Sequence, residues 1–114
     1  MTTITPSYLP NEFVYKMSNS QFLQPEIIKF NEWQESVGIC KPFIYKAQTI
    51  DGKSLPSFIK FFPIARQFRV QQTPEMIPGN YLVVLRGVIT SFYAMDFVSF
   101  NVIVKCEVYQ LKTF

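Results

Sequence analysis

The chain has 114 residues, which is enough for one domain of common size. Hydrophobic residues make up 48% of it and aromatic residues 17%, so a packed core is expected rather than disorder. The chain contains no histidine and its glycines are isolated, which argues against a histidine-dependent nucleophile and a glycine-rich phosphate loop. The net charge of +3 comes from cations scattered over several segments, so nucleic-acid binding is not expected.

Residues 1–24 are interpreted as an N-terminal arm or linker, because prolines, asparagines and serines surround one apolar cluster. In this cluster Phe13 and Tyr15 alternate with Val14 and Lys16. The alternation predicts an extra strand along a sheet edge, of this domain or of a neighbour, and an unanchored tail is the alternative. No signal peptide is recognised, and no apolar run is long enough for membrane insertion.

Residues 25–114 are predicted to form one all-β domain, since aromatic and β-branched residues dominate and alanine is scarce. Phe30 and Trp33 are expected in its core, and Asp51-Gly52 marks a turn. The predicted strands cover residues 26–33, 43–47, 58–61, 68–71, 81–86 and 98–107. Six or seven strands separated by turns favour two sheets packed as a sandwich.

The last two predicted strands carry more apolar side chains than one face of a sheet needs. Leu82 and Val84 alternate with inward residues of their strand, and Ile103 does so in the last strand. Exposed apolar patches usually mark sites of protein contact. The predicted docking surface therefore contains Leu82, Val84 and Ile103, together with Phe13, Val14 and Tyr15 of the arm.

The order of motifs resembles the dystroglycan-type cadherin-like family of immunoglobulin-like domains, over roughly residues 26–104. The matching segments are Gly38 before Phe43 and Tyr45, then Asp51-Gly52, Leu55-Pro56 before Phe58 and Phe61, Gly79-x-Tyr81 before Val83 and Leu85, and Phe100, Val102 and Val104. The resemblance implies an immunoglobulin-like or cadherin-like sandwich of about seven strands at the cell surface or outside the cell. Family members carry further acids that serve as calcium ligands, but Gln48 and, approximately, Val88 stand there. One carboxylate, Asp51, cannot replace several, so calcium binding is not expected.

The two cysteines, Cys40 and Cys106, would lie at the same end of such a sandwich and could form a disulfide. Cys106 falls in the inward phase of its strand, whereas Cys40 precedes Pro42, out of phase with Phe43. A bridge and two buried free thiols therefore stay open as alternatives. Two sulfurs without histidine do not make a metal site.

These observations favour a structural or adhesive module, not an enzyme, that contacts protein partners or neighbouring copies in a larger assembly. No catalytic, cofactor-binding or metal residue is predicted. The alternatives are an intracellular scaffold subunit of a large complex and a carbohydrate- or ligand-binding sandwich with Trp33, Tyr45 or Tyr93 as stacking platform. Trp33 is expected in the core in preference to such a platform.

Overall fold

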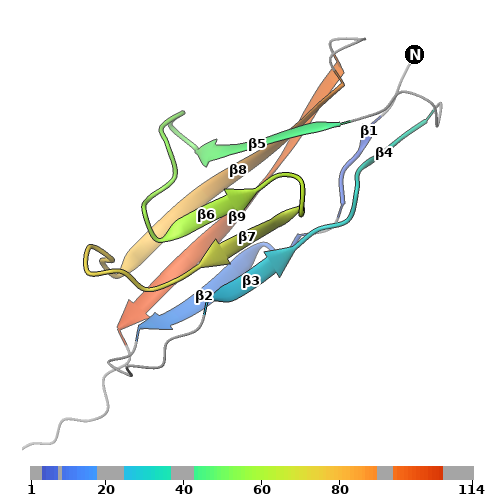
Figure 1. Ribbon diagram of the computed structural model, residues 1–114. Coiled ribbons are helices and arrows are strands. Elements are labelled where there is room, and N and C mark those ends of the chain that lie inside the picture. The colour runs from blue at the N-terminus through green and yellow to red at the C-terminus, as the bar shows by residue number, and fades with distance from the viewer. Residues whose placement is uncertain (1–3, 8, 18–24, 37–42, 90–93, 107–114) are drawn as a thin grey trace, which may run out of the picture.

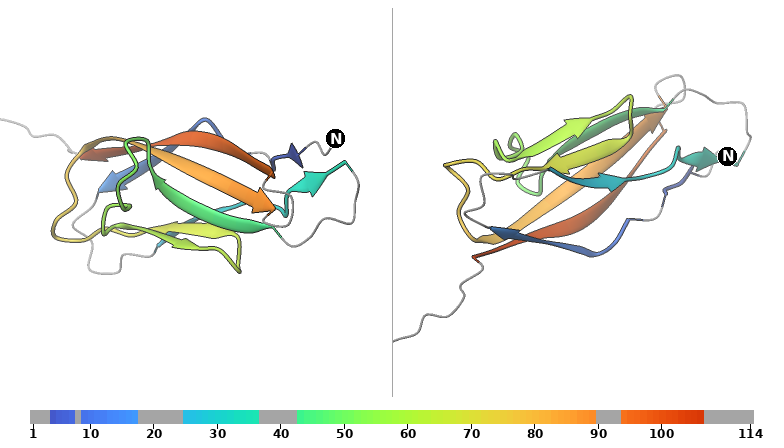
Figure 2. Two further views of the ribbon diagram at one scale, coloured as in Figure 1. Left: turned by 90° about the horizontal axis from the view of Figure 1, so that it is seen from above. Right: turned by 60° about the horizontal axis from the view of Figure 1, so that its bottom comes forward.

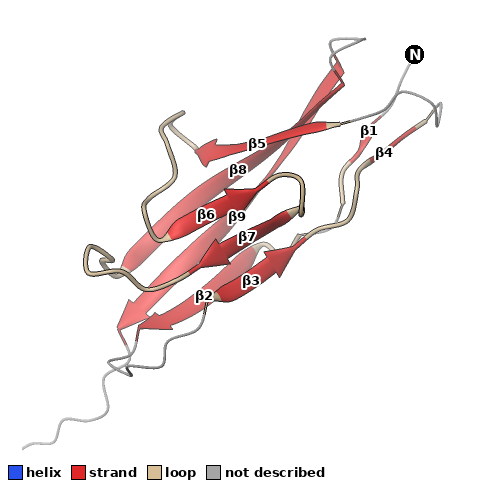
Figure 3. Cartoon of the chain, viewed as in Figure 1, coloured by secondary structure: helices blue, strands red, loops and turns tan. Residues whose placement is uncertain are grey.

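A computed structural model of the chain describes residues 4–7, 9–17, 25–36, 43–89 and 94–106 (Figure 1). Its strands are β1 (Ile4–Thr5), β2 (Glu12–Met17), β3 (Glu26–Lys29), β4 (Gln34–Glu35), β5 (Ile44–Thr49), β6 (Ile59–Phe62), β7 (Gln67–Val70), β8 (Gly79–Ile89) and β9 (Ala94–Cys106). The described residues contain strands, turns and loops but no helix (Figure 3). The prediction of an all-β protein is confirmed.

The larger strands form two sheets, one of four strands in the order β2-β9-β8-β5 and one of three in the order β3-β7-β6. The short strands β1 and β4 pair with each other in a separate two-stranded ribbon. The three-stranded sheet lies over one face of the four-stranded sheet, which gives a sandwich-like arrangement in two layers (Figure 2).

The hairpin of β8 and β9 is the longest element of the structure, and its register runs from Gly79 opposite Val104 to Ile89 opposite Ala94. Val83 and Leu85 of β8 are buried, as are Phe100 and Val102 of β9. These residues alternate with others on the opposite face, as expected for strands with a period of two residues. The inward phase predicted for both strands is confirmed for these four residues.

The N-terminal arm contributes the edge strand β2, which pairs in parallel with β9 of the same chain. Tyr15 of β2 points into the core and is 3% exposed. Its hydroxyl accepts a hydrogen bond from the backbone N–H of Gln72, which follows β7, at 3.1 Å. Residues 12–17 are therefore anchored in the fold, and the alternative of an unanchored tail is wrong for them.

The core lies between the two layers and is rich in aromatic rings. Phe68 of β7 meets Phe100 of β9 edge to face, with ring centroids 5.1 Å apart. Phe30 meets Tyr45 of β5 in the same way at 5.2 Å, so aromatic contacts join both sheets. The largest fully buried side chains are Trp33, Phe68, Phe100, Leu85, Ile89, Val70, Val83 and Val102.

The first predicted strand, residues 26–33, differs from the structure in its extent. The chain leaves the three-stranded sheet after Lys29 and pairs again at Gln34, where β4 meets β1. Phe30 and Trp33 lie in the interval, and both are buried as predicted. The backbone N–H of Phe30 donates to the carbonyl of Arg66 at 3.1 Å, so a single bond continues the sheet beyond β3.

Candidate functional site

The candidate site is the solvent-facing side of the four-stranded sheet, which we call the outer face. Tyr45, Val83 and Phe100 point into the core, so the residues between them in β5, β8 and β9 point outward. The outer face contains Val14 and Lys16 of β2, Ile44 and Lys46 of β5, Leu82, Val84 and Arg86 of β8, and Met95, Phe97, Ile103 and Lys105 of β9.

Large apolar side chains of the outer face are open to solvent. Phe97 is 58% exposed and Met95 is 56% exposed, and Val14, Ile44 and Leu82 are also exposed. Ile50, which follows β5, lines a shallow hollow of about 230 Å³ together with Val84, Arg86, Met95 and Phe97. Apolar groups gathered around a hollow are typical of protein contact sites.

Two cation pairs lie on the outer face beside these apolar groups. Lys46 lies opposite Arg86 in the ladder of β5 and β8. Lys16 lies opposite Lys105 in the ladder of β2 and β9. Like charges placed directly opposite each other in a sheet repel and are destabilising. Glu12 lies in the outward phase of β2 as well and offsets one of these charges, so the excess of positive charge is greater at the β5 edge than at the β2 edge.

The six predicted docking residues divide into three groups in the structure. Val14, Leu82 and Ile103 lie on the outer face, as predicted. Phe13 and Tyr15 instead point toward the core, because β2 buries the opposite phase from Val14 when it joins its own sheet. Their prediction as surface residues is wrong, since Tyr15 belongs to the core cluster and Phe13 packs against that cluster.

Val84 is the third case. It lies in the outward phase of β8, yet it is only 4% exposed. Val84 lines the hollow of about 230 Å³ together with Phe97 and Met95 of the adjacent strand β9. The prediction that Val84 is accessible is therefore wrong, and the accessible atoms of this region belong to its neighbours.

Sequence reasoning missed Met95 and Phe97, which are the most exposed apolar residues of β9. The predicted strand began at residue 98, whereas β9 begins at Ala94. Extending the alternation of Ser99, Asn101 and Ile103 toward the N-terminus places both side chains in the outward phase. Ile44 falls in the exposed phase of the predicted strand 43–47 and Ile50 lies beyond its end, so neither was predicted as a docking residue.

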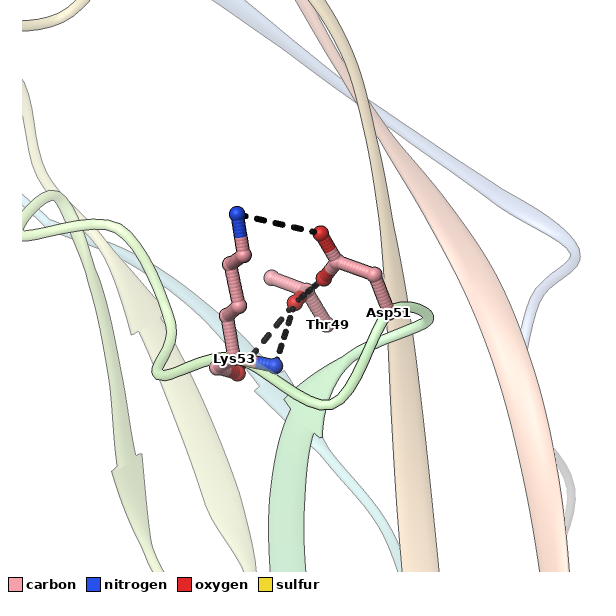
Figure 4. Close-up of polar contacts among 3 residues, drawn as sticks. All are labelled: Thr49, Asp51 and Lys53. Carbon is pink, nitrogen blue, oxygen red and sulfur yellow. Dashed lines mark hydrogen bonds and ion pairs between the residues drawn. The ribbon is translucent and has the colours of Figure 1, made fainter.

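The Asp51-Gly52 turn uses its polar groups within the turn itself (Figure 4). The Thr49 hydroxyl bonds to the Asp51 carboxylate and accepts from the backbone N–H of Lys53 at 3.1 Å. Lys53 Nζ lies 3.8 Å from Asp51 Oδ2. The Thr49 hydroxyl lowers the pKa of Asp51, with smaller contributions from the backbone and charge of Lys53. Asp51 therefore serves as a turn residue, and no described group of three or more acids, cysteines or histidines could hold a metal ion.

Cys106 ends β9 and is exposed, although an inward position was predicted. Val104, two residues earlier, is buried, so the inward phase is lost only at the strand end. Cys40 lies outside the described residues, so a bridge between Cys40 and Cys106 stays open, whereas the alternative of a buried thiol is wrong for Cys106.

Trp33 is 0% exposed, so it offers no ring face to a sugar. Tyr45 is also buried, and its hydroxyl accepts the backbone N–H of Trp33 at 2.9 Å. Burial raises the pKa of Tyr45, while that hydrogen bond opposes the shift. Neither residue can serve as a stacking platform, and Tyr93 lies outside the described residues.

In the described part of the chain, no helix is long and apolar enough to cross a membrane. No protein-family model matches this chain, and comparisons with curated proteins and with solved structures found no match.

Proposed function

We propose that this protein is a non-catalytic, immunoglobulin-like module that docks onto another protein of a larger assembly through its outer face. The observation that carries the proposal is the gathering of exposed Phe97, Met95 and Leu82 on one face of the four-stranded sheet. A monomer that exposes such a face to water leaves unused the free energy that burial would supply, about 25 cal/mol for each Å².

The strand orders support the immunoglobulin-like part of the proposal. Immunoglobulin-like domains place strands A, B, E and D in one sheet and C, F and G in the other. If β3 is B and β5 to β9 are C to G, the sheets here have the orders B-E-D and G-F-C. The arm then supplies strand A in two parts, β1 beside β4 and β2 beside β9.

Tyr81 adds a local feature of the same kind. Its hydroxyl donates to the carbonyl of Ile77 at 2.5 Å, near the start of β8. Immunoglobulin domains carry such a tyrosine near the start of strand F, bonded to backbone a few residues upstream. Their F-strand cysteine follows two residues later, and Val83 stands there in this chain. A bridge between Cys40 and Cys106, if formed, would thus differ from the disulfide between strands B and F.

The resemblance to the dystroglycan-type cadherin-like family extends this proposal to an extracellular or cell-surface location. It rests on the motifs between Gly38 and Val104. The alternative is an intracellular location, in which the protein would have the same docking role as a scaffold subunit of a large complex.

The charges of the outer face favour a different protein as partner over a second copy. Two copies meeting face to face across a two-fold axis would bring their own cation pairs, such as Lys46 and Arg86, into one contact. Like charges brought together in this way weaken association. A partner with an apolar centre flanked by carboxylates would complement both the apolar residues and the cations.

Lysine-directed cross-linking of the assembly from its natural source tests the docking face. Cross-links to another protein are expected from Lys46 and Lys105 of the outer face. Lys29 and Lys60 of the three-stranded sheet are the controls, since they face the other way. Cross-links confined to Lys29 and Lys60 would contradict the proposal.

A matched pair of variants sharpens this test. Phe97→Glu is expected to abolish the cross-links from Lys46 and Lys105, because it places a charge within the apolar centre. Ile27→Glu is the control, since Ile27 is an exposed apolar residue of β3 on the other sheet. Equal effects of the two changes would show that the outer face has no special role.

A further inference from the structure

The opposite side of the molecule carries a second group of cations. In the three-stranded sheet, Phe61, Phe68 and Ile28 point toward the core, so the residues between them point outward. Lys60 of β6 lies directly opposite Arg69 of β7 on this outward side. The two positive charges therefore face solvent side by side, which is unfavourable unless an anion lies between them.

Arg69 is held in place on two sides. Its guanidinium carbon lies 4.4 Å from the centroid of the Phe62 ring, in cation–π contact. With its amide turned so that the oxygen faces the guanidinium, Gln67 accepts from Arg69 Nη2 at 2.8 Å and from Nε at 3.0 Å. An arginine has five N–H donors, and these contacts use Nε–H and one N–H of Nη2. The second N–H of Nη2 and both N–H groups of Nη1 remain for another acceptor. A braced guanidinium loses little conformational entropy when it binds.

A pocket of about 340 Å³ adjoins this pair at the end of the sheet where β6 begins and β7 ends. The backbone N–H of Gln71 donates to the carbonyl of Phe58 at 3.0 Å, which ties together the two segments that bound it. Lys60 and Arg69 both line the pocket, and no acidic residue does. The remaining lining residues are Pro25, Ser57, Phe58, Phe62, Gln71, Gln72, Thr73 and Pro74.

The nearest acids along the chain do not neutralise these cations. Glu26 follows Pro25, and Glu75 follows Pro74. Among the described residues the ion pair between Lys53 and Asp51 is the only one, so neither Lys60 nor Arg69 has an acidic partner there. The pocket thus combines two unneutralised cations with the polar side chains of Ser57 and Gln71.

We infer that this pocket binds a doubly charged oxyanion, and specifically a terminal phosphate group such as that of a phosphate monoester. Two cations balance the charge of about −1.5 to −2 on a phosphate monoester near pH 7. A phosphodiester or a carboxylate carries one negative charge and would leave one cation unbalanced. The size suits a small group, since ligand pockets range from about 300 to 1,000 Å³. The inference does not rest on the docking role of the outer face, because it concerns the other sheet.

Titration of the ¹⁵N-labelled protein with inorganic phosphate at constant ionic strength tests this inference, with chloride as the balancing ion. Saturable shifts are expected at the backbone amides of Lys60 and Gln71 and at the Nε–H signal of Arg69. Lys60→Gln and Arg69→Gln are each expected to weaken binding about tenfold or more, because each removes a charge-assisted hydrogen bond. Lys46→Gln, on the outer face, is the control and should bind as the unchanged protein does.

Further probes distinguish the sources of the anion. Glycerol phosphate should bind at least as tightly as inorganic phosphate. Acetate should bind more weakly than inorganic phosphate, and a short oligothymidylate should bind more weakly for each of its phosphate groups. Equal binding of acetate, tighter binding of the oligothymidylate, or shifts that persist in both Lys60→Gln and Arg69→Gln would overturn the inference. Two separate variants, each with its thermal unfolding midpoint measured, keep loss of binding apart from loss of fold.

Discussion

Trp33 packs against β8 at Gly87 so closely that no other residue type fits there. A Cβ atom at Gly87 would lie 2.5 Å from Trp33 Cζ3 and would meet Cε3 as well. The Trp33 ring is enclosed by Phe43 and Tyr45, with centroids at 6.2 and 5.7 Å. It therefore has no free space into which to move, and glycine is required at this position.

Gly87→Ala is expected to lower the free energy of unfolding by about 1–3 kcal/mol or more, because the added methyl group overpacks the core. Urea unfolding measures the change. Ser99→Ala is the control, since Ser99 is exposed in the neighbouring strand β9 and its substitution should alter stability by less than about 0.5 kcal/mol. A Gly87→Ala protein as stable as the control would show that Trp33 can shift.

Tyr45→Phe is expected to lower the free energy of unfolding by about 1–3 kcal/mol, since the buried N–H of Trp33 would lose its acceptor. The pH dependence should change as well. Burial raises the pKa of Tyr45 above its ordinary 10.0, so its stabilising effect is full below that pH and is lost as pH rises through the raised value. Alkaline unfolding should therefore lose this component in Tyr45→Phe. An unchanged alkaline profile would contradict the role given to burial.

At the scale of elements, the two faces of β2 differ in their surroundings and so in their contribution to stability. Tyr15 fills the core and bonds to Gln72, whereas Val14 lies on the outer face. The two residues are adjacent, so they share backbone geometry and position in the ladder with β9.

Tyr15→Ala is expected to lower the free energy of unfolding by about 3–5 kcal/mol, as loss of a buried aromatic ring does. Val14→Ala, the matched control, should cost less than about 1 kcal/mol, because its side chain is partly in water. Thermal and urea unfolding measure both. Similar costs would mean that β2 is not anchored through Tyr15.

The turn after β5 should respond to acid. The lowered pKa of Asp51 means that its contribution to stability is present above the ordinary value of 3.8 and is lost as pH falls through the lowered value. Asp51→Asn is therefore expected to be less stable than the unchanged protein at about pH 6, and the difference should shrink toward about pH 2. Urea unfolding at several pH values measures it. A difference independent of pH would assign the effect to the turn geometry alone.

The sequence predicted elements well where one face is buried and poorly where neighbours decide exposure. The period of two in β5, β8 and β9 identified Tyr45, Val83 and Phe100 as inward. It left open whether β2 would join its own sheet or that of a neighbour, so it did not place Phe13 and Tyr15 inward. Nor could periodicity reveal the burial of Val84, because alternation indicates which face a side chain is on and not what lies around it.

At the scale of the whole molecule, both solvent-facing sheet sides carry opposed cations but differ in the groups beside them. The outer face surrounds its cations with apolar side chains, whereas Lys60 and Arg69 line a pocket that also contains the polar side chains of Ser57 and Gln71. The two proposed sites therefore differ in the partner that they favour, and the protein could hold both partners at once.

Association through the outer face is expected to weaken as salt is added, because part of its attraction comes from exposed charges. Raising the ionic strength from about 0.05 M to about 1 M shortens the screening length from over 10 Å to about 3 Å. The dissociation constant of the complex should rise across this range. Lys46→Gln should show a smaller rise, and an identical salt dependence would remove electrostatics from the explanation.

The parallel ladder of β2 and β9 also determines when β2 can pair during synthesis. Glu12 lies opposite Asn101, so strands separated by about 90 residues of sequence must meet. During synthesis β2 emerges from the ribosome before β9 has been translated. Tyr15 therefore stays exposed to water while the rest of the chain is made. The edge strand β2 is thus synthesised early but pairs late. Until then the nascent chain exposes an unpaired apolar strand to chaperones and to other chains.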